Sequence, residues 1–143
     1  MTGHAADPKI KTLKDLAAVL AKARKAGKKV ALCHGVFDLM HPGHVVHFRE
    51  ARGLADLLVV TLTPDRLVNK GPGRPLFTER LRLETLAALE SVDYVALNEW
   101  PTAVETIGLL KPDFYVKGAD YADRKADLTG KISDEEAAAR AAG

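Results

Sequence analysis

The chain has 143 residues, which is enough for one domain with one hydrophobic core and too few for two. Hydrophobic residues make up 47% and charged residues 28%, a balance typical of globular proteins and not of disordered or fibrous ones. The 21 Lys and Arg residues against 19 Asp and Glu residues leave a net charge of +2, which gives no reason to expect a nucleic acid or an acidic membrane as partner.

Cysteine usage and the lack of long apolar runs indicate the compartment. The single cysteine, Cys33, cannot form an internal disulfide, which favours a reducing environment. No stretch reaches the roughly 18 to 20 apolar residues that a membrane span needs, and residues 1–10 lack the hydrophobic region of a secretory signal. We therefore expect a cytoplasmic protein with no membrane partner, a single domain over residues 1–143, and a flexible segment over residues 1–10.

The first predicted elements are a helix and a buried strand. Residues 12–26 place apolar side chains at helical spacing, with Thr12 and Asp15 positioned as a capping box and Gly27 as the stop. The next segment, KVALC at 29–33, is short and mostly apolar and runs into a glycine, which suits a buried strand better than a helix.

The order of strand, turn and helix then recurs along the chain. A proline is well tolerated in a first helical turn, so the next helix is expected to begin at Pro42. Further strands are predicted at 56–63, 92–98 and 113–118, with helices from Thr78, from Thr102 to Pro112, and after Ser133. Strands that alternate with helices in a chain of this size predict a doubly wound α/β fold with a parallel sheet covered on both faces.

The segment CHGVFDLMHPGH, residues 33–44, has the features of an anion site. It follows the first long strand, and ligands of open parallel sheets collect beyond the carboxyl ends of strands. A helix that starts near Gly43 would point free backbone N–H groups at an anion, and Gly35 and Gly43 would let backbone approach it closely. His41 and His44 would add side-chain donors at the same helix end.

The histidines also allow less specific interpretations. An isolated histidine is more often a satisfied or exposed side chain than a ligand, and His47 is interpreted in this way. Three histidines at successive offsets of three residues fan around a helix, and no nearby cysteine completes a tetrahedral set, so a metal site at His41, His44 and His47 is the weakest alternative. We predict no metal-ligating residues.

The motif GVFDLMHPGH matches the signature Gly-x-Phe-Asp-x-x-His-x-Gly-His and thereby resembles the cytidylyltransferase-like nucleotidyltransferases. The segments NKGPGRPLFTERLRLETLAALESVDYV and LKPDFYVKGADY resemble the adenylyltransferase domain that completes ADP-heptose synthesis, and the resemblance covers nearly everything from Lys29 to Tyr121. It implies a Rossmann-like fold and transfer of AMP from ATP to a sugar phosphate such as D-glycero-D-manno-heptose 1-phosphate, with release of pyrophosphate, in lipopolysaccharide biosynthesis.

The resemblance also implies roles for individual residues around the triphosphate. His41 and His44 would stabilise charge on the α-phosphate and on the leaving pyrophosphate, while Val36 and Phe37 would offer backbone donors. Lys70 lies in a loop with glycines and prolines and would fold over the phosphates, although a loop lysine is also often simply solvated. Cys33 is not a candidate nucleophile, because it lies in the strand without an activating partner.

Further residues would contact the acceptor substrate or the nucleotide. Arg82 would hold the acceptor phosphate or the triphosphate tail, or else be an exposed surface charge. Asp38 would receive an acceptor hydroxyl, or else fix the turn. The last strand is followed by residues that would border the nucleotide or bond acceptor or base, unless they form an ordinary turn: Lys117, Gly118, Asp120 and Tyr121.

The expected ligands and partners follow from this chemistry. The substrates would be a nucleoside triphosphate and a sugar or polyol phosphate, and Mg²⁺ would bridge the triphosphate without a dedicated carboxylate cage. The family also suggests a homodimer and a partner sugar kinase. Members of similar size continue into a further strand and a helix start rich in serine or threonine, whereas this chain contains two serines, and Thr129, Gly130 and Lys131 are the nearest substitute.

Three alternatives remain open at this point. Glycerol-3-phosphate cytidylyltransferases are similar over the histidine signature, so a cytidylyltransferase that uses CTP and glycerol 3-phosphate or a related polyol phosphate is the nearest rival. A non-catalytic nucleotide-binding module would keep the fold without turnover. A small metal protein that uses the histidine cluster is the third.

Overall fold

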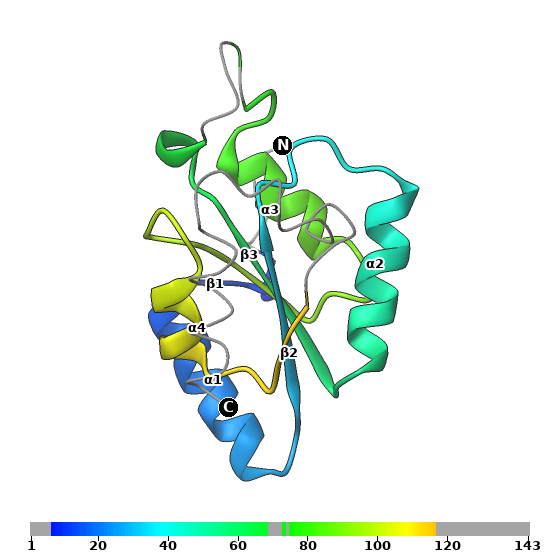
Figure 1. Ribbon diagram of the computed structural model, residues 1–143, viewed down its shortest axis with the longest axis vertical. Helices are drawn as coiled ribbons and strands as arrows, with labels where there is room; N and C mark the ends of the chain where they lie inside the picture. Colours follow the sequence, from blue (N-terminus) through cyan, green and yellow to red (C-terminus); the bar gives the residue numbers. More distant parts are fainter. Residues whose placement is uncertain (1–6, 69–72, 74, 117–143) are drawn as a thin grey trace, which may run out of the picture.

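The computed structural model describes residues 7–68, 73 and 75–116 and shows a single parallel sheet (Figure 1). In this part of the chain the strands are β1 (Ile10–Lys11), β2 (Val30–Gly35), β3 (Leu57–Leu62), β4 (Tyr94–Leu97) and β5 (Phe114–Tyr115). The helices are α1 (Leu13–Lys25), α2 (Pro42–Gly53), the 3₁₀ turn η1 (Asp65–Leu67), α3 (Glu79–Ala87) and α4 (Val104–Leu110). The sheet order is β1-β4-β3-β2-β5 and every pair is parallel, which confirms the predicted doubly wound α/β fold.

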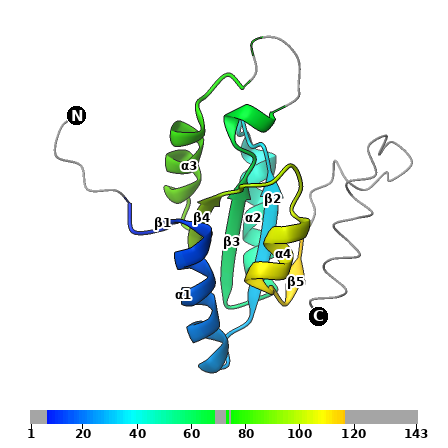
Figure 2. The ribbon, with the colours of Figure 1, turned by 90° about the vertical axis from the view of Figure 1, so that its left-hand side faces the viewer.

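Helices cover both faces of the sheet, as a buried parallel sheet requires. Successive strand residues point to opposite faces, so Ala31 and Cys33 of β2 pack against α2 and α3, whereas Val30 and Leu32 pack against α1 and α4. Figure 1 shows α2 on one side of β2 and the α1 and α4 pair on the other, and Figure 2 shows α1 and α4 from the side. Two apolar layers therefore fix the sheet in place.

Local sequence signals explain where most elements begin and end. The Thr12 hydroxyl accepts a hydrogen bond from the amide of Asp15 at 3.1 Å, and the Thr78 hydroxyl accepts one from the amide of Leu81 at 3.3 Å, so both predicted helix starts are confirmed. Gly27 has a φ of 83°, the left-handed conformation that stops a helix.

Two elements differ from the sequence-based expectation. Ile10 was assigned to a flexible segment, but it lies in β1, where it pairs with Val95 of β4. A strand of two residues is too short to show a period of two, so the sequence carries no signal for it. The helix expected near Thr102 begins instead at Val104, and the Thr102 hydroxyl accepts a hydrogen bond from the Val104 amide.

The topology decides where a ligand would bind. From β2 the chain moves through β3 to β4, and it then returns through α4 to β5 on the other side of β2. Such a reversal opens a crevice beyond the carboxyl ends of the two strands that flank it, here β2 and β5. That edge is the upper end of the sheet in Figure 1, and α2 begins there. Among the described residues, no helix combines the length and apolar character that crossing a bilayer requires.

Candidate active site

The first turn of α2 is built by two histidine side chains that bond to the backbone. His41 is the N-cap residue, and its Nδ1 accepts a hydrogen bond from the amide of Gly43 at 3.0 Å. His44 lies three residues later, and its Nδ1 accepts from the amide of His41 at 3.1 Å. The arrangement is a reciprocal capping box in which imidazoles replace the usual hydroxyl and carboxylate.

These bonds fix the tautomer of both rings. A backbone N–H can only donate, so both Nδ1 atoms must be unprotonated acceptors. In a neutral imidazole the proton then resides on Nε2. His41 and His44 therefore each present an Nε2–H donor, and their ring centroids lie 4.1 Å apart. The two donors come from one helix start at the carboxyl edge of the sheet, as the anion-site prediction requires.

The cap also corrects one expectation about this helix end. The sequence suggested free backbone N–H groups here, but the amide of Gly43 donates to His41 Nδ1 and the amide of His44 donates to the carbonyl of His41 at 2.9 Å. Pro42 has no N–H at all. These amides are thus bonded within the cap, so the imidazole rings rather than free backbone amides are the candidate donors at this helix end.

Close packing explains two of the glycines in the motif. A Cβ at Gly43 would lie 2.6 Å from Cε1 of His41, so any larger residue would displace that ring. A Cβ at Gly35 would lie 3.0 Å from Cζ of Phe37. Both glycines thus make room for a ring of the site.

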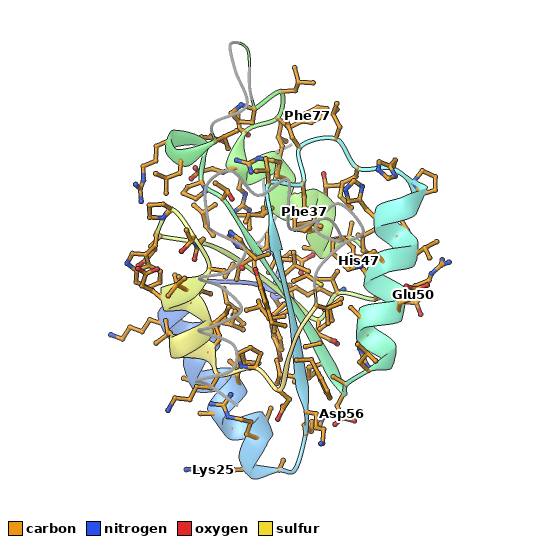
Figure 3. The ribbon with its side chains drawn as sticks, viewed as in Figure 1. Lys25, Phe37, His47, Glu50, Asp56 and Phe77 are labelled. Carbon is orange, nitrogen blue, oxygen red and sulfur yellow. The ribbon has the colours of Figure 1, made fainter. Side chains whose placement is uncertain are left out.

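Phe37 connects the turn after β2 to one of the histidines. Its backbone has a φ of 50°, in the left-handed region that residues other than glycine seldom adopt. Its ring packs edge-on against His44 with centroids 5.9 Å apart, and against Phe48 with centroids 5.3 Å apart. Figure 3 places Phe37 near the upper end of the sheet, at the edge where β2 ends.

Arg82 contradicts one of its two sequence-based interpretations, the exposed surface charge, while its predicted contact with a phosphate stays a prediction. It is not an exposed charge, because its side chain is 1% exposed. Four N–H···O bonds join it to the protein: Nε to the Phe77 carbonyl, Nη1 to the carbonyls of Val36 and Thr63, and Nη2 to the Asp65 carboxylate at 2.6 Å. Thr63 and Asp65 were not singled out from the sequence, since nothing local marks them as partners of a distant arginine.

Asp38 adopts the second of its two predicted roles in a longer-range form. Its two carboxylate oxygens accept hydrogen bonds from the amides of Leu76 and Phe77 at 2.7 and 2.9 Å. The carboxylate therefore ties the histidine-bearing loop to the segment just before α3. The substrate-binding role of Asp38 stays a prediction.

Cys33 and His47 form a separate pair under α2. Cys33 Sγ lies 3.6 Å from His47 Nε2, and burial raises the pKa of the thiol to about 12, which keeps it neutral as a core residue rather than a nucleophile. Burial also lowers the pKa of His47, while the nearby charge of Glu50 opposes that shift. Figure 3 shows His47 and Glu50 on the same helix.

Other predicted site residues cannot be placed. Lys70, Lys117, Gly118, Asp120 and Tyr121 lie outside the described residues. Within residues 7–68, 73 and 75–116, no group of three or more His, Cys, Asp and Glu side chains could hold a metal ion. A hollow of about 440 Å³ lies between α2 and the end of α3 and contains none of the predicted site residues; Phe48, Arg49 and Ser91 are among its lining residues.

The comparisons with known proteins agree with this geometry. The family described as cytidylyltransferase-like matches residues 32–136, which include the histidine cap. The chain belongs to the cytidylyltransferase-like family. Its core, the parallel sheet with an HxGH sequence at the start of α2, is thus the Rossmann-like fold of that family.

Two individual relatives are both bifunctional HldE proteins. The bifunctional protein HldE of Citrifermentans bemidjiense is 48% identical over 83% of this chain and 26% of its own length. That of Aliarcobacter butzleri is 42% identical over 88% of this chain and 27% of its own length. The chain therefore spans about a quarter of the curated relatives it matches.

A solved structure shows the same fold. The lipopolysaccharide core biosynthesis protein from Thermoplasma volcanium superposes with a TM-score of 0.63 at 32% identity, covering 75% of this chain and 88% of its own. The similarity to this protein and to the HldE proteins confirms the resemblance inferred from the sequence motifs.

Proposed function

We propose that this chain is a nucleotidyltransferase domain that transfers AMP from ATP to a sugar phosphate, D-glycero-D-manno-heptose 1-phosphate being the first candidate. The observation that carries the proposal is the pair of imidazole rings of His41 and His44 at the start of α2, whose centroids lie 4.1 Å apart and whose Nδ1 atoms accept hydrogen bonds from backbone amides. The 42–48% identity to HldE proteins and the motif resemblance to ADP-heptose synthases support the choice of substrates.

The reaction needs alignment and charge stabilisation rather than a covalent enzyme intermediate. A phosphate oxygen of the sugar phosphate attacks the α-phosphorus of ATP, a new P–O bond forms, and the bond to the bridging oxygen of the β-phosphate breaks, so that pyrophosphate leaves with the electron pair. Negative charge grows on the α-phosphate oxygens and on the leaving group. Two fixed Nε2–H donors would stabilise that charge, and removal of one such donor typically costs about 10²- to 10³-fold in rate.

Other residues of this proposal come from the family resemblance. Lys70, Lys117 and Gly118 would contact the nucleotide, and Asp120 and Tyr121 would contact the acceptor or the base. Mg²⁺ would arrive with the triphosphate, because it binds largely through phosphates and water. A sugar kinase would supply the phosphorylated acceptor, and a homodimer is the proposed assembly.

A pyrophosphate-release assay tests the proposal. The protein is incubated with ATP or CTP and with heptose 1-phosphate or glycerol 3-phosphate in all four combinations, with Mg²⁺ present. We expect release with ATP and the heptose phosphate, and loss of about 10²- to 10³-fold in kcat in the His44→Gln variant. Release with CTP and glycerol 3-phosphate alone would show a cytidylyltransferase instead.

A binding measurement tests whether the chain binds nucleotide without turnover. If calorimetry detects nucleotide binding while no combination releases pyrophosphate, the chain is a nucleotide-binding module and the transferase proposal is wrong. The matched control is His47→Gln, which replaces a histidine on the same helix that bonds to Cys33 rather than to the cap. We expect this control to keep the wild-type rate.

A further inference from the structure

We propose that Arg82 is a positioning residue that orients His44 through the turn at residues 36–37, and that it does not bind a substrate phosphate. This inference adds a residue role to the proposed function, and the kinetic part of its test rests on that function. Its starting point is the burial of the guanidinium, which is 1% exposed and surrounded by protein acceptors.

Arg82 bonds to a turn, residues 36–37, whose backbone conformation is strained at Phe37. Phe37 has a φ of 50°, and such a conformation is unfavourable for a residue with a side chain, so it persists only where surrounding contacts fix it. Arg82 Nη1 donates to the carbonyl of Val36 at 3.0 Å, immediately before the strained residue. The arginine is therefore placed to hold the peptide that sets the direction of the Phe37 ring.

A second set of bonds fixes the same turn from the other side. Arg82 Nε donates to the Phe77 carbonyl at 3.1 Å, and the carboxylate of Asp38 accepts from the amide of Phe77 at 2.9 Å. Phe77 is thus joined through its carbonyl to the arginine and through its amide to the aspartate next to Phe37. Figure 3 shows Phe37 and Phe77 at the same upper end of the molecule.

The Phe37 ring transmits this constraint to the histidine. It meets the His44 ring edge-on with an interplanar angle of 85°, and it also contacts Phe48, which is fully buried in α2. The Nδ1 of His44 is held by the His41 amide, so the ring contact limits its remaining rotation. A misplacement of about 1 Å at a reacting group can cost about 10²-fold in rate.

The exposure of its ionic partner favours positioning over stability as the reason for this arginine. Arg82 pairs with Asp65 at 2.6 Å, but the Asp65 side chain is 39% exposed, and ion pairs with a solvent-exposed partner contribute little to stability. A fork of donors in a fixed plane can nevertheless hold several carbonyls in one geometry. Here the fork joins the turn after β2, the turn after β3 and the segment before α3.

The test compares Arg82→Lys with Arg80→Lys. Lysine keeps the positive charge but cannot reproduce the planar fork. Arg80 lies on the same helix, is exposed, and pairs with Glu84, so it is the matched control. We expect Arg82→Lys to lower kcat about 10²-fold with KM for the sugar phosphate within about threefold, whereas Arg80→Lys leaves both unchanged.

A readout without substrate separates this inference from the proposed function. In the ligand-free protein, long-range ¹H–¹⁵N NMR spectra of the imidazoles should shift at His44 in both Arg82→Lys and Phe37→Leu, and should stay unchanged in Arg80→Lys. If the wild type releases no pyrophosphate, the proposed function fails while these spectra still decide the positioning role.

Two results would overturn the inference. A raised KM with an unchanged kcat and unchanged His44 signals in Arg82→Lys would identify a phosphate ligand. Unchanged kinetics and spectra would show that Arg82 is structural only. Should Arg82→Lys fail to fold, Asp65→Asn takes its place, because it removes the charge that orients Nη2 while it keeps the arginine; the same shift at His44 is then expected, and its absence contradicts the inference.

Discussion

The two kinds of histidine on α2 differ in what their nitrogens touch. His41 and His44 use Nδ1 to accept hydrogen bonds from backbone amides, which leaves Nε2–H as a donor in the neutral ring, whereas His47 Nε2 lies beside the buried thiol of Cys33. Histidines three positions apart thus differ in their contacts, and only His41 and His44 have the contacts of the proposed site. The sequence predicts the division between them, but not the bonds that cause it.

The half-buried position of His47 predicts a pH dependence of stability. Burial lowers its pKa in the folded protein below the ordinary value of 6.5. As the pH falls through 6.5, the unfolded chain takes up a proton that the folded protein resists, so the free energy of unfolding should decrease below that pH and be at its full value above it.

Urea unfolding at pH 8.0, 6.5 and 5.5 measures this effect in wild type and His47→Gln. All other ionisable groups are common to both proteins, so their contributions cancel in the comparison. We expect the wild type to lose more stability than the variant as the pH falls. A constant difference between the two proteins across this range would contradict the assignment.

At the scale of elements, the start of α2 combines a structural and a chemical task. The His41 imidazole caps the helix with Nδ1 and presents Nε2–H at the carboxyl edge of the sheet. The two tasks can be separated because asparagine is a good N-cap residue whose shorter side chain does not place an N–H at the position of the imidazole Nε2.

His41→Asn and His41→Ala therefore form a matched pair. We expect His41→Asn to change the free energy of unfolding by no more than about 0.5 kcal/mol, and His41→Ala to lower it by about 1 kcal/mol. Both should lower kcat about 10²- to 10³-fold, because both lack the Nε2–H donor. Wild-type activity in His41→Asn would show that the ring acts as a cap alone.

Elements and residues also differ in how far the sequence could predict them. The parallel, doubly wound sheet was predictable from apolar segments such as KVALC and from their alternation with helices, whereas its order β1-β4-β3-β2-β5 was not predicted. The HPGH segment carries residue types that indicate an anion site. The surroundings of Arg82 were not predictable, because Val36, Thr63 and Asp65 lie between 17 and 46 residues away, and only folding brings them together.

At the scale of the whole molecule, Cys33 reports on the integrity of the sheet. It is 1% exposed in the apolar layer between the sheet and α2, and burial raises the pKa of its thiol to about 12. Because the thiolate is the reactive form, the folded protein should react slowly at pH 8.

Thiol labelling at increasing urea concentrations measures this. We expect the labelling rate of Cys33 to rise in parallel with unfolding followed by circular dichroism, since both need the sheet to open. Rapid stoichiometric labelling without urea would contradict the buried, neutral thiol. His47→Gln should label faster at low urea, because it removes an imidazole whose Nε2 lies 3.6 Å from the sulfur.

The central claim is that two neutral imidazoles donate from Nε2 to one polyphosphate. Long-range ¹H–¹⁵N NMR spectra at pH 7.5, recorded without ligand and during titration with ATP or pyrophosphate, test it most directly. The account predicts Nε2-protonated neutral rings at His41 and His44 in the free protein, and Nε2 shifts of both together on titration. Protons on Nδ1, or signals that do not move when the nucleotide binds, would contradict it.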